Sequence, residues 1–281
     1  MPDAGRAWAK AAQANPAPEP ESPGFSRELT TVIDGPRGMA AVETIRSAFD
    51  SLGEARASDV FIWGLGEPEH PAATKLGGLP YRPADEPWPM SAAGRPLSFM
   101  AQVCFADSKD LVGVPGSLLR KPRPLPGDVL LMFAPGDYLA DWDDDDQSSL
   151  VFEWRSLGLA DPVRKVPPTA KTFAPAFAQI HRTADFPEPA DDHPVRMLFS
   201  GRDLCIVRGT KIGGVPAFDG MLPGRHLCTL SSLNPSGGHF PLLNAARPQD
   251  IPSGLLMMGD LGLLHLFIDA AGKIRWTVRG G

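Results

Sequence analysis

The chain has 281 residues, including 31 prolines and 29 glycines, and a formal net charge of −6. This length fits one large domain or two of ordinary size, and the many Pro and Gly residues favour short elements joined by turns. The acidic balance argues against general affinity for nucleic acid or an anionic membrane surface, and no apolar run is long enough to span a membrane.

The N-terminal part divides into a polar arm and a predicted helix. Residues 1–25 are rich in Ala, Pro and Glu, so we expect a disordered or loosely docked arm ahead of one domain over 26–281. Residues 36–52 carry apolar side chains at helical spacing, with Pro36 suited to the first turn. The arm lacks the apolar stretch of a secretory signal, so a cytoplasmic location is expected.

Alternating and apolar runs predict strands along the rest of the chain. The predicted strands are 59–65, 97–105, 128–134, 149–156, 195–199, 204–209, 226–232, 254–269 (strand, tight turn and strand) and 273–278. Because the strands come at hairpin spacing and do not alternate with helices, we expect a strand-rich α+β fold with antiparallel sheets and few helices.

Two segments between the strands are dominated by proline. Residues 81–89 (YRPADEPWP) contain three prolines, which predicts an irregular segment held in place by Tyr81 and Trp88. Residues 157–193 form a long Pro-rich connection, and a short helix is predicted inside it at 176–182.

A seven-residue phrase occurs twice, as TKLGGLP at 74–80 and TKIGGVP at 210–216. A match of this length with Lys, Gly-Gly and Pro in register indicates an internal duplication. The predicted pseudo-repeats are about 59–156 and 195–278, joined by the Pro-rich connection.

The repeated phrase has two interpretations. Glycines in strands often mark tight bends, and this is the interpretation that we favour. Alternatively, backbone N–H groups and an ammonium form an anion site, although the spacing is not that of a P-loop. The candidate ligand-binding residues are Lys75, Gly77, Gly78, Lys211, Gly213 and Gly214.

Six motifs together resemble the YwqG-like family, a bacterial domain of uncharacterised function. They are KLGGLP (75–80) with the following Trp88-Pro89, PLSFMAQ (96–102), LPGDVLLMF (125–133), IGGVP (212–216), LCTLSS (227–232) and GDLGLLHLFI (259–268). The resemblance implies a duplicated α+β fold in a bacterial cytoplasmic protein and no established reaction. Some members look associated with toxin–immunity neighbourhoods, which implies protein binding. Thr229, Ser231 and His265 stand where the family commonly has Gln, Asp and an aromatic residue.

Charged and aromatic residues suggest an interaction surface. The acidic run at 141–146 lacks the glycine and distal Glu of an EF-hand loop, so a solvated loop or a docking patch for a basic partner is expected. The candidate interaction residues are Trp88, Asp143, Asp144 and Asp145.

Reactive residues form no recognisable catalytic motif. Cys104, Cys205 and Cys228 lie in apolar runs without a CxxC pair, which favours buried thiols over a disulfide framework or a zinc site. No catalytic residue, metal or cofactor is therefore predicted. One hypothesis is a shared site of His226, His239, His265 and Asp260; the alternative is a scatter of unrelated histidines.

The sequence favours a non-catalytic binding or protein-interaction module. An immunity protein of the antitoxin type is one form that such a module could take. The alternative is a small-molecule-binding protein or a hydrolase with a site in the groove between the repeats. No nucleic-acid or membrane partner is expected, and the oligomeric state is left open.

Overall fold

The structure is a computed structural model that describes residues 55–112, 124–135, 149–186, 209–216, 224–233, 254–256 and 262–279. The chain divides into two units, Met1–Ser51 and Leu52–Gly281, and all described residues lie in the second. The arm predicted at 1–25, the helix at 36–52 and the strands at 195–199 and 204–209 lie outside the described residues.

Strands dominate the described residues. They are β1 (Arg56–Leu65), β2 (Lys75–Leu76), β3 (Ser98–Cys104), β4 (Val129–Ala134), β5 (Val151–Arg155), β6 (Ala176–Asp185), β7 (Lys211–Gly213), β8 (Arg225–Ser231), β9 (Leu263–Ile268) and β10 (Ile274–Arg279). Two four-residue helical turns, the 3-10 helix η1 (Phe105–Ser108) and the α-helix α4 (Lys109–Val112), follow β3. None of the described helices is long and apolar enough to cross a membrane.

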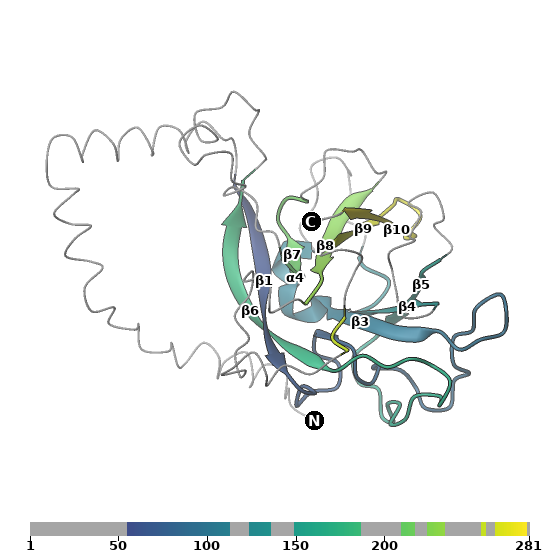
Figure 1. Cartoon of the computed structure of the whole chain (residues 1–281). Helices are drawn as coiled ribbons and strands as arrows, with labels where there is room; N and C mark the ends of the chain where they lie inside the picture. Colours follow the sequence, from purple (N-terminus) through teal and green to yellow (C-terminus); the bar gives the residue numbers. More distant parts are fainter. Residues whose placement is uncertain are drawn as a thin grey trace, which may run out of the picture. The chain divides into compact units, whose positions relative to one another are not determined.

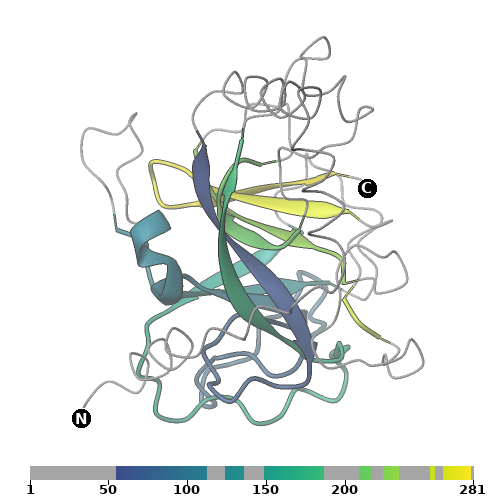
Figure 2. The same ribbon diagram turned by 90° about the vertical axis from the view of Figure 1, so that its left-hand side faces the viewer.

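All ten strands join one antiparallel sheet in the order β10-β9-β8-β7-β1-β6-β2-β3-β4-β5. The sheet curls into a nearly closed barrel (Figures 1 and 2). We call β2–β5 the first arm and β7–β10 the second arm. The predicted strand-rich antiparallel fold is therefore confirmed, and the predicted strands at 59–65, 97–105, 128–134, 149–156, 226–232 and 273–278 correspond to β1, β3, β4, β5, β8 and β10.

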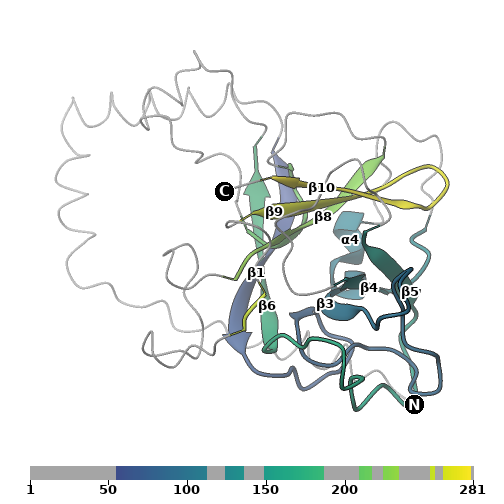
Figure 3. The ribbon, with the colours of Figure 1, turned by 45° about the vertical axis from the view of Figure 1, so that its right-hand side comes forward.

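The centre of the sheet is the antiparallel pair of β1 and β6. Each of the ten residues of β1 lies opposite a residue of β6, from the pair Arg56–Asp185 to the pair Leu65–Ala176. Figure 1 shows the two strands as long curved arrows that run side by side. The second arm attaches to β1 through β7, and the first arm attaches to β6 through β2. In Figure 3 the strands β8–β10 lie above β3–β5, and β1 and β6 run past both sets.

The short helix predicted at 176–182 is wrong, because these residues belong to β6. Every residue of β6 is in register with a residue of β1, so the ladder satisfies the backbone along its full length. A helix of seven residues would have to offset a costly nucleation step with few internal hydrogen bonds. The tertiary pairing with β1 therefore overrides the local helical tendency of an Ala-rich segment.

Two apolar clusters hold the sheet in shape. The larger one takes residues from both arms and from β1, among them Trp63, Met100 and Trp276, each at most 1% exposed. The smaller one lies on the opposite face of the first arm, where Phe99 and Phe133 pack against loop residues. The first arm is thus covered by apolar contacts on both faces, which explains its near-continuous apolar strands.

Candidate functional site

The second copy of the repeated phrase includes β7, where Lys211 is 1% exposed. Its Nζ donates to Oδ2 of Asp185 at the end of β6 and, at 2.7 Å, to the carbonyl oxygen of Val215. The same Asp185 oxygen accepts the N–H of Val215 at 3.0 Å. The phrase is therefore closed into a loop around one buried carboxylate.

The first copy makes the matching contacts. Lys75, on β2, is 2% exposed and donates through Nζ to Oε2 of Glu67 at 2.8 Å. The other oxygen of Glu67 accepts the N–H of Leu79 at 2.9 Å. In both copies the lysine and the backbone four residues later share one carboxylate, but Glu67 is 40% exposed whereas Asp185 is buried.

The paired glycines allow this arrangement. Gly77, Gly78, Gly213 and Gly214 have φ values of 61°, 70°, 73° and 65°, in the left-handed region that favours glycine. A Cβ on Gly214 would lie 2.3 Å from Oδ2 of Asp185, and one on Gly78 would lie 2.0 Å from Oε1 of Glu67. The glycines are therefore required both for the bend and for the close approach of the carboxylate.

The electrostatics of the two lysines follow from this burial. Desolvation lowers the pKa of Lys211, and the contact with Asp185 opposes that shift. The pKa of Lys75 is lowered for the same reason and is raised in part by Glu67. Each ammonium already has a carboxylate partner, so an anion would have to compete with it; ligand binding at the six predicted residues remains a prediction.

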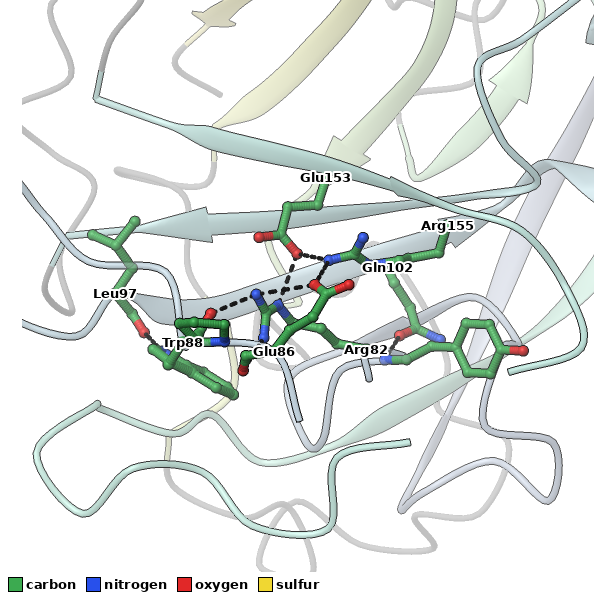
Figure 4. Close-up of polar contacts among 9 residues, drawn as sticks. Arg82, Glu86, Trp88, Leu97, Gln102, Glu153 and Arg155 are labelled. Carbon is green, nitrogen blue, oxygen red and sulfur yellow. Dashed lines mark hydrogen bonds and ion pairs between the residues drawn. The ribbon is translucent and has the colours of Figure 1, made fainter. Parts of the chain in front are cut away.

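A network of two arginines and two glutamates holds the proline-rich loop after β2 (Figure 4). The side chain of Arg82 is 5% exposed and donates through Nε to Glu153 of β5 at 2.9 Å. Its Nη1 and Nη2 donate to the carbonyl oxygens of Glu86 and Pro87 at 2.9 and 2.6 Å. Arg155 donates to the carboxylates of Glu86 and Glu153, both at 2.6 Å. Charge and backbone contacts together fix the loop without regular structure.

Tyr81 and Trp88 anchor the same loop, as the sequence predicted. The hydroxyl of Tyr81 accepts the N–H of Leu159 at 2.7 Å, and Nε1 of Trp88 donates to the carbonyl oxygen of Leu97 at 2.8 Å. The Trp88 ring also packs edge-on against Phe133, with 5.6 Å between ring centroids. Trp88 thus has a packing role, and its predicted role in partner binding remains a prediction.

A second ionic cluster joins the central strands β1 and β6 to the helical turns η1 and α4. Arg182 of β6 donates through Nη2 to Asp59 of β1 at 3.0 Å and through Nη1 to Asp110 of α4 at 2.7 Å. Ser108, in η1, donates to Asp59 at 2.6 Å. Asp59 is 1% exposed, and hydrogen bonds from Arg182 lower the pKa of Asp110. This cluster therefore ties η1 and α4 to β1 and β6.

Two histidines converge on one threonine in the second arm. Oγ1 of Thr229 lies 3.1 Å from Nε2 of His226 and 2.9 Å from Nδ1 of His265. The hydroxyl has one proton to donate, so at most one imidazole accepts from it and at least one donates to it. Burial lowers the pKa of His226 to about 3, which keeps this ring neutral at ordinary pH. The shared site hypothesised from sequence is thus assembled in part, since His239 and Asp260 lie outside the described residues.

The histidine pair belongs to a polar row that crosses the second arm. Lys211, Thr229, His265 and Thr277 are in register on β7, β8, β9 and β10, and each is at most 3% exposed. A buried row of this kind requires hydrogen-bond partners for every member. The row brings an ammonium, two hydroxyls and an imidazole to one face of the sheet.

The corresponding row of the first arm is Lys75, Gln102, Leu131 and Glu153, in register on β2, β3, β4 and β5. Gln102 is satisfied locally: Nε2 donates to the carbonyl oxygens of Pro71 and Ala73 at 2.7 Å each, and Oε1 accepts the N–H of Tyr81 at 2.9 Å. An apolar Leu131 thus stands where the second arm has His265. The two rows also differ at Gln102 and Thr229 and at Glu153 and Thr277, so only the lysine is common to both arms.

The described thiols are poor nucleophiles. Cys104 and Cys228 are buried and free, as predicted. Burial raises the pKa of Cys104 to about 12 and raises that of Cys228 as well, so both remain protonated at neutral pH. Within the described ranges, no group of three or more His, Cys, Asp or Glu side chains could hold a metal ion. The candidate interaction residues Asp143, Asp144 and Asp145 lie outside these ranges.

Sequence reasoning found the lysines but missed their acidic partners. Glu67 is eight residues from Lys75, whereas Asp185 is 26 residues from Lys211, so no common spacing marks the pairs. The available signal was the position of each acid at or just after the end of a long central strand. The incorrect helix at 176–182 concealed that signal for Asp185.

Comparison with known families gives one match. Residues 74–121 match the family model described as Domain of unknown function (DUF1963). The matched segment starts at the first copy of the repeated phrase and includes β3, η1 and α4. No curated protein matches the chain.

Proposed function

We propose that the protein is a non-catalytic binding module that acts through a protein partner. The observation that carries this proposal is the pairing of its buried charges: Lys75, Lys211, Arg82 and Asp59 each bind an opposite charge within the fold. Paired charges fix geometry and leave little free chemical reactivity. A rigid scaffold whose polar side chains are used internally suits recognition better than turnover.

We further propose that the two arms derive from an internal duplication, as expected of a YwqG-like protein. Three matched features support this: the repeated phrase, the shared carboxylate in each copy, and the attachment of each arm to a different strand of the β1–β6 pair. A duplicated scaffold offers two related faces that can diverge. An immunity protein of the antitoxin type, which acts by binding alone, is one role that such a scaffold would serve.

The experiment that tests the binding proposal is affinity capture from the native host, with mass spectrometry of bound proteins and small molecules. We expect one protein to be enriched over a control bait and then to bind the purified chain in calorimetry. If purified candidates bind no better than an unrelated acidic protein of similar size, the proposal is wrong.

A second candidate function is binding of a small polar molecule, or its hydrolysis, beside the histidine pair. The specific observation in favour is the convergence of His226 and His265 on Thr229, with Lys211 in the same row. Convergent polar groups are typical of small-molecule sites. The equivalent position of the first arm holds the apolar Leu131, so the polar character is not required for the strand to pack.

His265→Leu tests this second candidate, because Leu131 shows that leucine is accepted at the matching place. We expect the variant to fold and to lose any thermal shift that a ligand screen finds with the unmodified protein. Leu131→Val, a small change in the first arm, is the matched control and should keep the shift. Equal shifts in all three proteins would exclude the histidine pair as the site.

A further inference from the structure

Strand β5 forms one edge of the ten-stranded sheet. On one side it pairs with β4, from Val151 opposite Phe133 to Arg155 opposite Val129. On its other side, no backbone hydrogen bond joins it to any residue that the structure describes. At the opposite edge, Trp276, Thr277 and Val278 of β10 make further interactions. The edge along β5 therefore presents backbone donors and acceptors that only another extended strand can satisfy as a row.

The sequence of β5, VFEWR, contains no Pro, no Lys and no bulge, and its two charged residues are of opposite sign. Natural edges are commonly interrupted by Pro, by Lys or by a bulge. Val, Phe and Trp are strong strand formers, and all five residues are half-buried. The edge is thus free of bulges, apolar in part and suited to pairing.

The charges of β5 are arranged for pairing with a copy of itself. Glu153 and Arg155 lie on the same face of the strand, on either side of Trp154. An antiparallel copy related by a twofold axis at Trp154 places each Glu153 opposite the Arg155 of the other copy. We propose that two copies of the chain pair along β5 in this register and form a continuous sheet across a symmetric dimer.

Glu153 and Arg155, which form the ion pairs in this register, each have unused hydrogen-bonding capacity. Glu153 accepts hydrogen bonds through Oε2 alone, and Arg155 donates through Nη2 alone, among the described residues. Oε1 of Glu153 and Nη1 of Arg155 can therefore bind across the dimer without breaking the network around Arg82. Both side chains are 20% exposed, so the pairs form at a partly solvated interface.

The apolar residues of the strand agree with the same register. It places Val151 opposite Leu157 of the other copy, just beyond the end of β5. Leu157 is 43% exposed and is one of two exposed large hydrophobic side chains among the described residues. The pairing covers it with a half-buried valine, and cross-strand apolar pairs of this kind stabilise sheets. Apolar, ionic and central aromatic pairs thus all result from one axis.

The first test is the oligomeric state of the intact protein, measured by sedimentation velocity from low to high micromolar concentration. A strand of this length buries a modest area, so we expect a reversible dimer of micromolar affinity. A protein that remains monomeric at the highest concentration would overturn the proposal. A dimer that keeps its affinity when β5 is altered would overturn it equally.

The second test uses complementary charge reversals. In the Arg155→Glu dimer, two glutamates face each other at both positions where Glu153 and Arg155 were paired. In the Glu153→Arg dimer, two arginines face each other at the same positions. Each variant alone should weaken the dimer by about 100-fold or more, because like charges across an interface cost several kcal/mol. Mixed in equal amounts, the two variants should form a heterodimer, since every opposed pair is then attractive.

The control is Arg275→Glu on β10, the other edge of the sheet. This change reverses one charge in the same way but should leave dimerisation unaltered. Circular dichroism and melting of each variant establish that it is folded before mixing. If folded Arg155→Glu and Glu153→Arg variants fail to associate with each other, or if Arg275→Glu disrupts the dimer to the same extent, the register is wrong.

Discussion

Lys211 and Asp185 form an ion pair in which both side chains are at most 1% exposed. The matching pair, Lys75 and Glu67, has the same buried lysine but a carboxylate that is 40% exposed. Removal of one partner from a buried pair leaves an uncompensated charge, whereas an exposed partner can be hydrated again. The two copies of one phrase should therefore respond very differently to the same substitution.

Lys211→Met should lower the free energy of unfolding by about 3–5 kcal/mol, the usual cost of stranding a buried charge. Lys75→Met is the matched control and should cost about 1 kcal/mol, because water can solvate Glu67. Urea denaturation of the two variants measures the difference. A double variant, Lys211→Met with Asp185→Asn, should recover part of the loss, since the amide oxygen can still accept from Val215. Equal losses at the two lysines would contradict the argument.

Gly214→Ala should be more destabilising than Gly78→Ala, and both should exceed Gly94→Ala. All three glycines have positive φ, so each alanine incurs a conformational cost of about 1–2 kcal/mol. No atom lies within 4 Å of a Cβ at Gly94, so that variant reports the conformational cost alone. At Gly214 the Cβ also meets the buried Asp185, which adds about 1–3 kcal/mol of overpacking. At Gly78 the exposed Glu67 can move away, so the remaining close contact of the added Cβ is with Cβ of Pro175 at 2.9 Å. Chemical denaturation of the three variants tests this order.

The sequence predicts the sheet far better than it predicts the site. Strands such as β3 and β4 are recognised because their apolar runs end at turn residues, a local signal. The strand β6 is missed because its alternation is weak and its stability comes from β1, more than a hundred residues away in sequence. The same reason hides the acidic partner of Lys211: Asp185 is brought to it by the register of β6 and β7 with β1, which no local pattern encodes.

The histidine pair is an intermediate case. Its residues were identified from sequence as one hypothetical group, but their geometry depends on the register of β8 and β9, including the irregularity between His226 and Cys228. Strand prediction alone cannot locate such an irregularity. The contact of both rings with Thr229 therefore required the structure.

His226 should make the protein less stable as the pH falls below neutrality. The native ring stays neutral because burial lowers its pKa to about 3, whereas the unfolded chain takes up a proton near the ordinary value. Below neutrality the unfolded state therefore binds more protons than the native state. The free energy of unfolding decreases by about 1–2 kcal/mol as the pH is lowered from 6.5 to 5.

His226→Gln tests this, because glutamine can still bind Thr229 and does not titrate. Urea denaturation at several pH values should give a shallower pH dependence for the variant than for the unmodified protein. His181→Gln, a change at an exposed residue of β6, is the matched control for the loss of an imidazole. A variant with the original slope would show that His226 is not the titrating group.

Arg82→Lys should destabilise the proline-rich loop more than a conservative substitution usually does. The guanidinium binds Glu153 and two carbonyl oxygens through three different nitrogens, and its side chain is 5% exposed. A lysine ammonium is a single point charge and cannot make this planar set of contacts, so we expect a loss of about 2–4 kcal/mol. Arg95→Lys, an exposed site in the same loop, should be nearly neutral.

The loop also carries Trp88, whose indole N–H donates to the carbonyl oxygen of Leu97. The NMR signal of this N–H should shift in Arg82→Lys and stay unchanged in Arg95→Lys. An unshifted signal in both variants would mean that Trp88 is held by Leu97 and Phe133 without help from Arg82.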